Sequence, residues 1–257
     1  MIVTIQSANR SEKVGALLKK IAPINPIFYV PMWQVEDYKN AGAENVVGVD
    51  GVLPMKPKQL NAALKDYVGQ TIVTMDDDYI SCVRVSPDKK AKGCSLLELI
   101  EEALEEFKNT DAELAGFSTT SNPFFLQTTE SEDHGMITGQ ILFHKCNGVL
   151  FDEAMNEMED LEYIIQHHLH KGILKINRFV VNFHIFGRND AADEKYTGGY
   201  KGFRTKETEF QVYNYMRNKH PVAFSNNIGY TKTAEIPRKV QWKKLLERNN
   251  ADLNSFF

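Results

Sequence analysis

The sequence predicts a single α/β domain with a mostly parallel central sheet flanked by helices, on two observations. First, short β-rich segments alternate with amphipathic helical patterns over about the first 80 residues, as in a doubly wound parallel sheet. Second, the 257 residues are 42% hydrophobic and 25% charged, which is typical of a globular protein with a sizeable core. In such a fold we expect ligands at the carboxyl ends of the strands.

Helices and strands are expected in a regular order. In the first part of the chain, strands are expected at residues 2–5, 27–30, 45–49 and 71–75, and helices at 11–21, 35–41 and 59–67. In the second part, helices are expected at 95–108 and 159–170, and strands at 114–118, 139–144 and within 173–186. Ser95 is the expected N-cap of the first of these helices. Leu161, Ile164, Ile165 and Leu169 are spaced to face the core from the second.

Composition and charge narrow the class of protein. The net charge is −4 and the pI is near 6.0, so no global basic field attracts nucleic acid, although a local basic patch remains compatible with these values. Cys82, Cys94 and Cys146 share no metal-like spacing, and their odd number suits a reducing compartment. The first residues lack a signal-peptide pattern, and no apolar stretch is long enough to span a bilayer. We therefore expect a cytoplasmic enzyme or binding protein.

Three acids, Asp76, Asp77 and Asp78, directly follow the strand expected at 71–75. Adjacent carboxylates repel one another and are costly to bring near a core unless a cation or hydrogen bonds compensate. Acids at a strand end can hold a divalent cation, which in turn neutralises a diphosphate. If the chain stays extended, Asp76 and Asp78 project to the same side. The alternative is a solvated acidic turn, and the sequence does not decide which two acids face the metal.

A second acidic pair, Glu159 and Asp160, stands at the start of the helix expected at 159–170. Acids in a first helical turn are favoured by the helix dipole, so this pair alone indicates simple capping. The functional alternative is a carboxylate general base that faces an acceptor hydroxyl.

Taken together, the order and spacing of these motifs resemble those of glycosyltransferases with the Rossmann-like GT-A fold. The resemblance covers residues 1–190 or so, and it implies a metal-dependent transferase that uses a UDP-sugar as donor. It further implies that the acidic triplet binds Mn²⁺ or Mg²⁺ at the sugar-nucleotide diphosphate. Asp160, preceded by Glu159, would then deprotonate the acceptor in an inverting reaction. Residues 1–80 would form a nucleotide-binding half and residues 81–190 an acceptor half.

The same resemblance assigns further site residues. The metal ligands would be Asp76, Asp78 and His184, with His167, His168 and His170 as competing histidines and a core role for His184 equally open. The donor nucleotide and sugar would be contacted by Ser7, Asn9, Arg10, Lys58, Asn61, Asp76 and Asp77.

Residues 191–257 are expected to form a mobile loop and a basic C-terminal segment, with a helix at 238–248. Two groups of aromatic and basic side chains are expected to bind nucleic acid: Tyr200, Lys201, Phe203 and Arg204 in the loop, and Trp242, Lys243 and Lys244 in the C-terminal segment. An ordinary solvated loop, or a lid over the donor, would have the same composition.

The chain also resembles the DNA-modifying glycosyltransferases of T-even-like bacteriophages. This resemblance implies double-stranded DNA containing 5-hydroxymethylcytosine as partner, transfer from UDP-arabinose or UDP-glucose, and a host-cell cytoplasm. A glycosyltransferase for a glycan or protein, a nucleotidyltransferase, and a non-catalytic nucleic-acid-binding module remain as alternatives. The identity of the sugar, the stereochemistry and the oligomeric state stay open.

Overall fold

The structure is a computed structural model, and it describes residues 1–155, 157–184, 206–224, 240–242, 244–245 and 247. The parts of the predicted loop at 190–204 and of the predicted helix at 238–248 that fall outside these ranges are not described.

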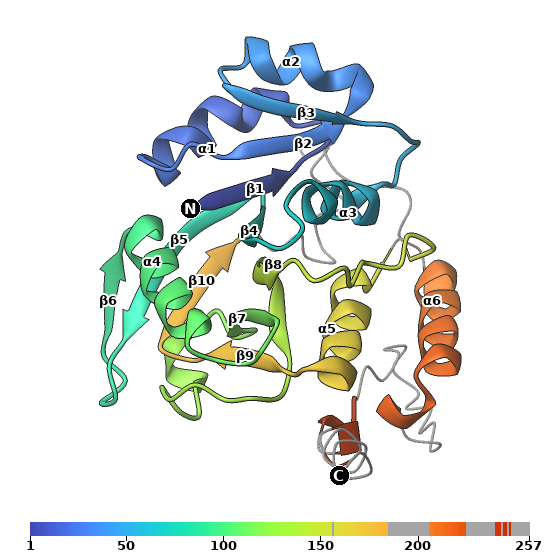
Figure 1. Ribbon diagram of the computed structural model, residues 1–257. Helices are drawn as coiled ribbons and strands as arrows, with labels where there is room; N and C mark the ends of the chain where they lie inside the picture. Colours follow the sequence, from blue (N-terminus) through green and yellow to red (C-terminus); the bar gives the residue numbers. More distant parts are fainter. Residues whose placement is uncertain (156, 185–205, 225–239, 243, 246, 248–257) are drawn as a thin grey trace.

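Within the described residues, the central sheet has seven strands and confirms the mostly parallel arrangement (Figure 1). Across the sheet the order is β3 (Asn45–Val49), β2 (Ile27–Pro31), β1 (Ile2–Gln6), β4 (Thr71–Asp76), β8 (Ile137–Lys145), β7 (Leu114–Ser118) and β9 (Ile173–Ile176). Only β8 runs antiparallel to its neighbours β4 and β7, while β1 to β4 and the β7–β9 pair are parallel. The carboxyl ends of β1, β2 and β4 therefore meet at one edge of the sheet.

A smaller antiparallel sheet joins β10 (Phe179–Phe183), β5 (Tyr79–Val85) and β6 (Ala91–Cys94). The sequence analysis places β10 inside a predicted strand region, but it misses β5 and β6. Strand β6 is almost fully exposed and has no apolar alternation, so its pattern carries no signal. Since β5 begins at Tyr79, the chain does not stay extended through the acids. Asp77 and Asp78 form the turn that leads from β4 into β5.

The helices agree well with the predicted segments. They are α1 (Val14–Ile21), preceded by the 3₁₀ turn η1 (Ser11–Lys13), α2 (Val35–Asn40), preceded by η2 (Met32–Gln34), α3 (Lys56–Asp66), α4 (Leu96–Lys108) and α5 (Glu159–His170). Short 3₁₀ turns follow at η3 (Pro123–Phe125) and η5 (Pro221–Ala223), and α6 (Lys206–Lys219) was not predicted. Ser95 caps α4 as predicted, because its Oγ accepts the Glu98 N–H and the Glu98 carboxylate accepts the Ser95 N–H. Helix α3 begins three residues before the predicted start, with Pro57 in its first turn.

The helices cover the two faces of the central sheet with separate apolar clusters. One cluster joins α1, α2 and α4 to one face, and the other joins α3 and α5 to the opposite face. Successive strand residues alternate between the clusters, as Ile72 and Val73 of β4 do. A third cluster packs Leu161 and Ile165 of α5 against α6. Helix α5 is thus held between the sheet and α6.

One predicted core position on α5 is wrong. Leu169 is 37% exposed, whereas Leu161, Ile164 and Ile165 are buried as expected. Leu169 lies in the last turn, where His167 and His168 take the buried positions instead. Across the described part of the chain, no helix is both long enough and apolar enough to cross a bilayer.

Candidate active site

The acidic triplet consists of Asp76, the last residue of β4, and of Asp77 and Asp78 in the turn that leads into β5. The end of β1 supplies partners for this turn. Both carboxylate oxygens of Asp77 have hydrogen-bond donors. Ser7 Oγ donates to one oxygen, and Arg10 Nη1 donates to the other at 2.5 Å. Ser7 Oγ also lies 2.5 Å from the hydroxyl of Tyr38. The structure therefore brings together Ser7, Arg10 and Asp77, three of the residues predicted to contact the donor.

The loop after β1 is fixed by contacts with the turn after β2. Asn9 has a φ of 57°, in the left-handed region, and its N–H donates to Gln34 Oε1 at 2.9 Å. The Gln34 amide in turn donates to Asn9 Oδ1. Gln34 is buried, and the sequence analysis did not identify it because a single glutamine after a strand has no recognisable pattern.

Asp78 differs from Asp77 in having an unsatisfied oxygen. Its Oδ1 is buried and has no hydrogen-bond partner among the described residues, while Oδ2 is 3.9 Å from Arg10 Nη1. Burial, followed by the charges of Asp76 and Asp77, raises the pKa of Asp78 to about 7. A carboxylate with one buried oxygen that has no hydrogen-bond partner among the described residues, beside two further acids, is a suitable ligand for a hard divalent cation. The side chains here therefore fit a Mg²⁺ or Mn²⁺ ion.

His184 lies next to the triplet although it is remote in sequence. Strand β10 pairs with β5 so that Phe183 is opposite Tyr79, and the His184 N–H donates to the Asp78 carbonyl at 3.0 Å. Its side chain is exposed. No set of three His, Cys, Asp or Glu side chains within the described ranges already has metal-binding geometry. The acids and His184 would therefore have to adjust around an ion.

The competing histidines lie toward the opposite end of α5. His168 Nε2 is 3.2 Å from the Gly135 carbonyl, and His170 Nδ1 is 2.8 Å from a carboxylate oxygen of Glu113. Because a helix rises about 1.5 Å per residue, these side chains are more than about 10 Å along the axis from the acids that begin α5. Of the histidines considered in the sequence analysis, the geometry favours His184.

Lys56 links the two acidic clusters, and the sequence analysis did not identify its role. Its Nζ, at the start of α3, lies 2.8 Å from Asp76 Oδ1 and 3.4 Å from Glu159 Oε1. Burial alone would lower the pKa of Lys56, but Asp76 and Glu159 outweigh burial and raise it. Burial also raises the pKa of Asp76, against the opposing effect of Lys56. The basic segment at the start of this helix was the available signal.

The two residues that were predicted on the same helix have other neighbours. Asn61 is buried and holds the segment before α5: its amide donates to the Phe151 carbonyl at 3.0 Å, and its Oδ1 accepts the Phe151 N–H at 2.8 Å. It also donates to Glu153 at 3.0 Å. Lys58 is half-buried, and its side chain passes close to Gly51 in the loop that precedes α3.

Asp160 packs against the start of β8. A Cβ atom added at Gly139 would fall 2.3 Å from Asp160 Oδ2, so only glycine leaves room for this carboxylate. The other oxygen, Oδ1, accepts the N–H of Leu161 at 2.8 Å. The capping interpretation therefore holds for one oxygen of Asp160 and leaves the other facing Gly139.

The charge state of Asp160 suits proton transfer. Burial, followed by the charge of Glu159, raises the pKa of Asp160 to about 6, and Lys56 opposes this rise. A carboxylate with a pKa close to the operating pH is an effective general base. Helix α5 begins directly after Met158, whose φ of 56° lies in the left-handed region. Such strained backbone positions are concentrated at functional sites.

Of the seven residues predicted to contact DNA, the structure describes only Trp242 and Lys244. Tyr200, Lys201, Phe203, Arg204 and Lys243 lie outside the described residues. Trp242 is half-buried, and its ring centroid lies 4.9 Å from that of His168, a residue in the C-terminal half of α5. Lys244 is exposed one residue before the buried Leu245. Trp242 thus lies toward the end of α5 away from Asp160.

Several solved structures have a fold similar to that of this chain. A structure of glucosyl-3-phosphoglycerate synthase from Mycobacterium tuberculosis with Mn²⁺, UDP-glucose and phosphoglyceric acid covers 89% of this chain and 84% of its own, at a TM-score of 0.51 and 13% identity. A structure of the same synthase with Mg²⁺ and UDP matches over 87% of this chain and 80% of the synthase chain, at a TM-score of 0.50 and 14% identity. The chain has the GT-A fold. A structure of S. aureus TarS 1–349 matches at a TM-score of 0.47 and 14% identity, and the chain spans 59% of its length. The sequence matches no protein-family profile and no curated protein.

Proposed function

We propose that this protein is a metal-dependent glycosyltransferase that transfers a sugar from a UDP-sugar to an acceptor hydroxyl. The observation that carries the proposal is the pairing of two carboxylates with different tasks at one edge of the sheet. Asp78 has a buried oxygen without a partner, and Asp160 has a pKa of about 6. Lys56 connects their surroundings through Asp76 and Glu159. The synthase with the same fold holds Mn²⁺ and UDP-glucose in its structure.

On the donor side, Asp78, Asp76 and His184 would hold Mn²⁺ or Mg²⁺. When bound, such an ion stabilises the departing diphosphate as a Lewis acid. The loop after β1 would contact the nucleotide through Ser7, Asn9 and Arg10. Arg10 is already oriented by Asp77, so its guanidinium needs little reordering to meet a phosphate.

On the acceptor side, Asp160 acts as general base. The acceptor oxygen forms a bond to the anomeric carbon while the bond from that carbon to the diphosphate oxygen breaks. The hydroxyl proton passes to Asp160, and later to solvent. Leu161 holds one carboxylate oxygen through its N–H, which orients the other. Attack assisted by a base on the face opposite the leaving group inverts the configuration.

For the acceptor itself, the sequence resemblance to phage enzymes predicts 5-hydroxymethylcytosine in double-stranded DNA. This candidate acceptor has its support in the sequence resemblance alone, because five of the seven side chains expected to contact DNA lie outside the described residues. Duplex DNA is therefore one acceptor in the experiment below.

The test is an incubation with Mn²⁺ and a panel of UDP-sugars, in the presence of glycans, proteins, and duplex DNA with or without 5-hydroxymethylcytosine. We expect Mn²⁺-dependent release of UDP and a product heavier by one sugar, detected by mass spectrometry. Asp78→Asn should reduce turnover by roughly 10²-fold or more, since it removes a charged metal ligand. Asp88→Asn, at an exposed carboxylate in the β5–β6 turn, is the matched control.

Two outcomes would contradict the proposal. Release of pyrophosphate would identify a nucleotidyltransferase, which cleaves a different bond of the nucleotide. No metal-dependent reaction with any donor would leave the acidic triplet as a structural turn.

A further inference from the structure

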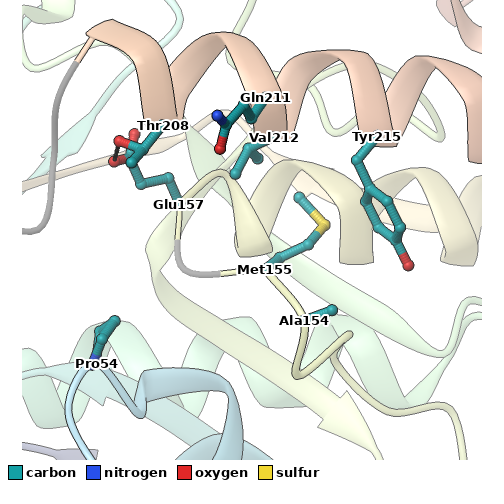
Figure 2. A pocket seen from close by; sticks show the side chains of 8 residues that line it. All are labelled: Pro54, Ala154, Met155, Glu157, Thr208, Gln211, Val212 and Tyr215. Atoms are coloured by element: carbon teal, nitrogen blue, oxygen red, sulfur yellow. Dashed lines mark hydrogen bonds between the residues drawn. The ribbon is translucent and has the colours of Figure 1, made fainter.

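A pocket of about 370 Å³ opens between α6 and the segment that leads into α5 (Figure 2). This volume lies within the usual range of small-molecule sites. The described residues that line it are Pro54, Ala154, Met155, Glu157, Thr208, Gln211, Val212 and Tyr215.

Helix α6 presents one complete face to this pocket. Thr208, Gln211, Val212 and Tyr215 are spaced i, i+3, i+4 and i+7, so their side chains lie on one side of the helix, as Figure 2 shows. Tyr213 and Met216 belong to a different face and are buried in the third apolar cluster. The pocket-lining face also contacts the rest of the protein. Val212 packs, partly buried, against the same cluster. Thr208 donates a hydrogen bond to Glu157, and Tyr215 donates one to Asp152.

The position of α6 is also fixed by polar contacts at its C-terminal end. The buried carboxylate of Glu162 on α5 lies 3.0 Å from Lys219 Nζ and 2.7 Å from His220 Nε2. Lys219 is also 2.6 Å from Asp152. Because breaking a buried ion pair is costly, these contacts make the pocket a preformed feature of the fold.

The pocket adjoins the candidate active site along the chain. Glu157 stands two residues before Glu159, and Pro54 stands two residues before Lys56. Two residues of chain span at most about 7 Å, so the pocket lies next to the segments that carry Lys56 and Glu159, whose side chains contact each other. A ligand in the pocket would extend toward Asp160.

The lining suits a sugar ring. Glu157 is 8% exposed and accepts a hydrogen bond from Thr208 Oγ1 at 2.9 Å, and the Gln211 amide lies beside them. Pro54 and Val212 supply apolar surface. A pyranose or furanose has hydroxyls around its edge and C–H groups on its faces, which match a lining of carboxylate, amide and hydroxyl groups with apolar side chains.

The charge of the lining residues favours neutral ligands over anionic ones. Among the described lining residues, Glu157 carries the only formal charge, and it is negative. A phosphate or carboxylate group in this pocket would face a buried like charge, and none of the described lining residues is a cation.

We propose that this pocket binds the acceptor, and that the acceptor is a neutral sugar residue rather than a phosphorylated compound or a nucleic acid. The inference rests on the proposed function, because Asp160 must be the base for the pocket to hold the acceptor. It refines that function by naming the class of compound that receives the sugar.

The test compares acceptors and variants at saturating UDP-sugar and Mn²⁺. Methyl β-D-glucopyranoside and cellobiose are the neutral probes, and glucose 6-phosphate and duplex DNA with 5-hydroxymethylcytosine are the charged ones. Val212→Trp fills the pocket and should raise the KM for a neutral probe by about tenfold or more, while the KM for the UDP-sugar stays unchanged. Asn218→Trp, on an exposed position of the same helix, should alter neither value.

A second variant tests the charge argument. Glu157→Gln keeps the shape of the pocket and removes its charge, so it should narrow the preference for methyl β-D-glucopyranoside over glucose 6-phosphate. Saturation-transfer NMR with methyl β-D-glucopyranoside should show binding to the wild type and to Asn218→Trp, and no binding to Val212→Trp. Circular dichroism verifies that each variant is folded.

Slow UDP release without an acceptor separates the two proposals. If this hydrolysis is present but Val212→Trp leaves transfer to the neutral probes unchanged, the pocket assignment is wrong. The same conclusion follows if the wild type prefers glucose 6-phosphate or the modified DNA, or if neither neutral probe binds or reacts. If the wild type shows no metal-dependent UDP release at all, the proposed function fails and the acceptor assignment fails with it.

Discussion

Burial shifts the pKa values of side chains at the two ends of helix α5 in opposite directions. At its start, burial and Glu159 raise the pKa of Asp160 to about 6, and Lys56 keeps a positive charge nearby. Toward its end, burial lowers the pKa of His167 to about 4, so this histidine is neutral near pH 7. Both of its ring nitrogens are buried without hydrogen-bond partners among the described residues, and the ring packs edge-on against Tyr163.

The two residues differ in the role that we assign to them: Asp160 carries a functional charge, whereas His167 is a structural side chain. Burial disfavours charge at both ends. Toward the end of α5, the charge of Glu113 opposes the effect of burial on His167 but does not outweigh it. At the start of α5, Lys56 Nζ lies 3.4 Å from Glu159, so a positive charge directly faces the acids. A buried charge that is retained in this way is an expected feature of a catalytic site. The predictions below test whether the two ends differ as this argument requires.

The largest effect is expected for Asp160→Asn. Loss of the general base should reduce kcat by about 10²–10⁴-fold, with Mn²⁺ and UDP binding retained. The variant should also be more stable at pH 8, by roughly 1–3 kcal/mol, since it removes a charge that burial disfavours. That gain should vanish below about pH 4, where the carboxyl group is protonated in both folded and unfolded states. Turnover assays and urea unfolding at both pH values check this, and unchanged turnover would show that Asp160 is not the base.

Removal of the counter-ion should be the next largest change. Lys56→Met leaves Asp76 and Glu159 without their shared partner, so we expect a loss of about 3–5 kcal/mol in unfolding free energy at pH 8. It should also raise the pKa of Asp160 further. Lys65→Met, at an exposed position of the same helix, is the control for urea unfolding. Equal stability of the two variants would show that the Lys56 contacts contribute little.

The pH dependence of the wild type should reveal the same carboxylate. Below pH 6, kcat should fall by about tenfold for each pH unit as Asp160 becomes protonated, and it should be level above about pH 7. In Lys56→Met, the fall in kcat at low pH should begin at a higher pH than in the wild type. A flat profile from pH 5 to 8 would exclude a base with the assigned pKa.

The smallest effect is expected at the other end of the helix. His167→Leu replaces a buried polar ring that has no partner, and should stabilise the protein by about 1 kcal/mol at pH 7 without a change in kcat. In the wild type, the lowered pKa means that stability is lost as pH falls from about 6.5 toward 4, because the unfolded state takes up the proton first. This part of the pH dependence should be absent in the variant and present in His134→Leu, a partly exposed control. A loss of activity in His167→Leu would remove the distinction between the two ends.

Several features were determined by the sequence alone, for local reasons. Helix α5 runs over the predicted residues, Ser95 caps α4, and the acidic triplet stands at the end of a buried strand, with Asp76 as its last residue. Each depends on neighbouring residues, such as a capping box or a run of β-branched side chains. The resemblance to the GT-A fold rested on the order of such local motifs.

The site itself was decided by the tertiary structure. Lys56 became the shared partner of Asp76 and Glu159, and Gly139 became the surface under Asp160, only when α3 and β8 met the acids. The antiparallel pairing of β10 with β5 brought His184 to Asp78. The pocket likewise exists only because α6 packs beside α5. Hydrophobic period and capping are read from residues a few positions apart, whereas charge compensation and close packing depend on contacts between segments that the chain keeps far apart.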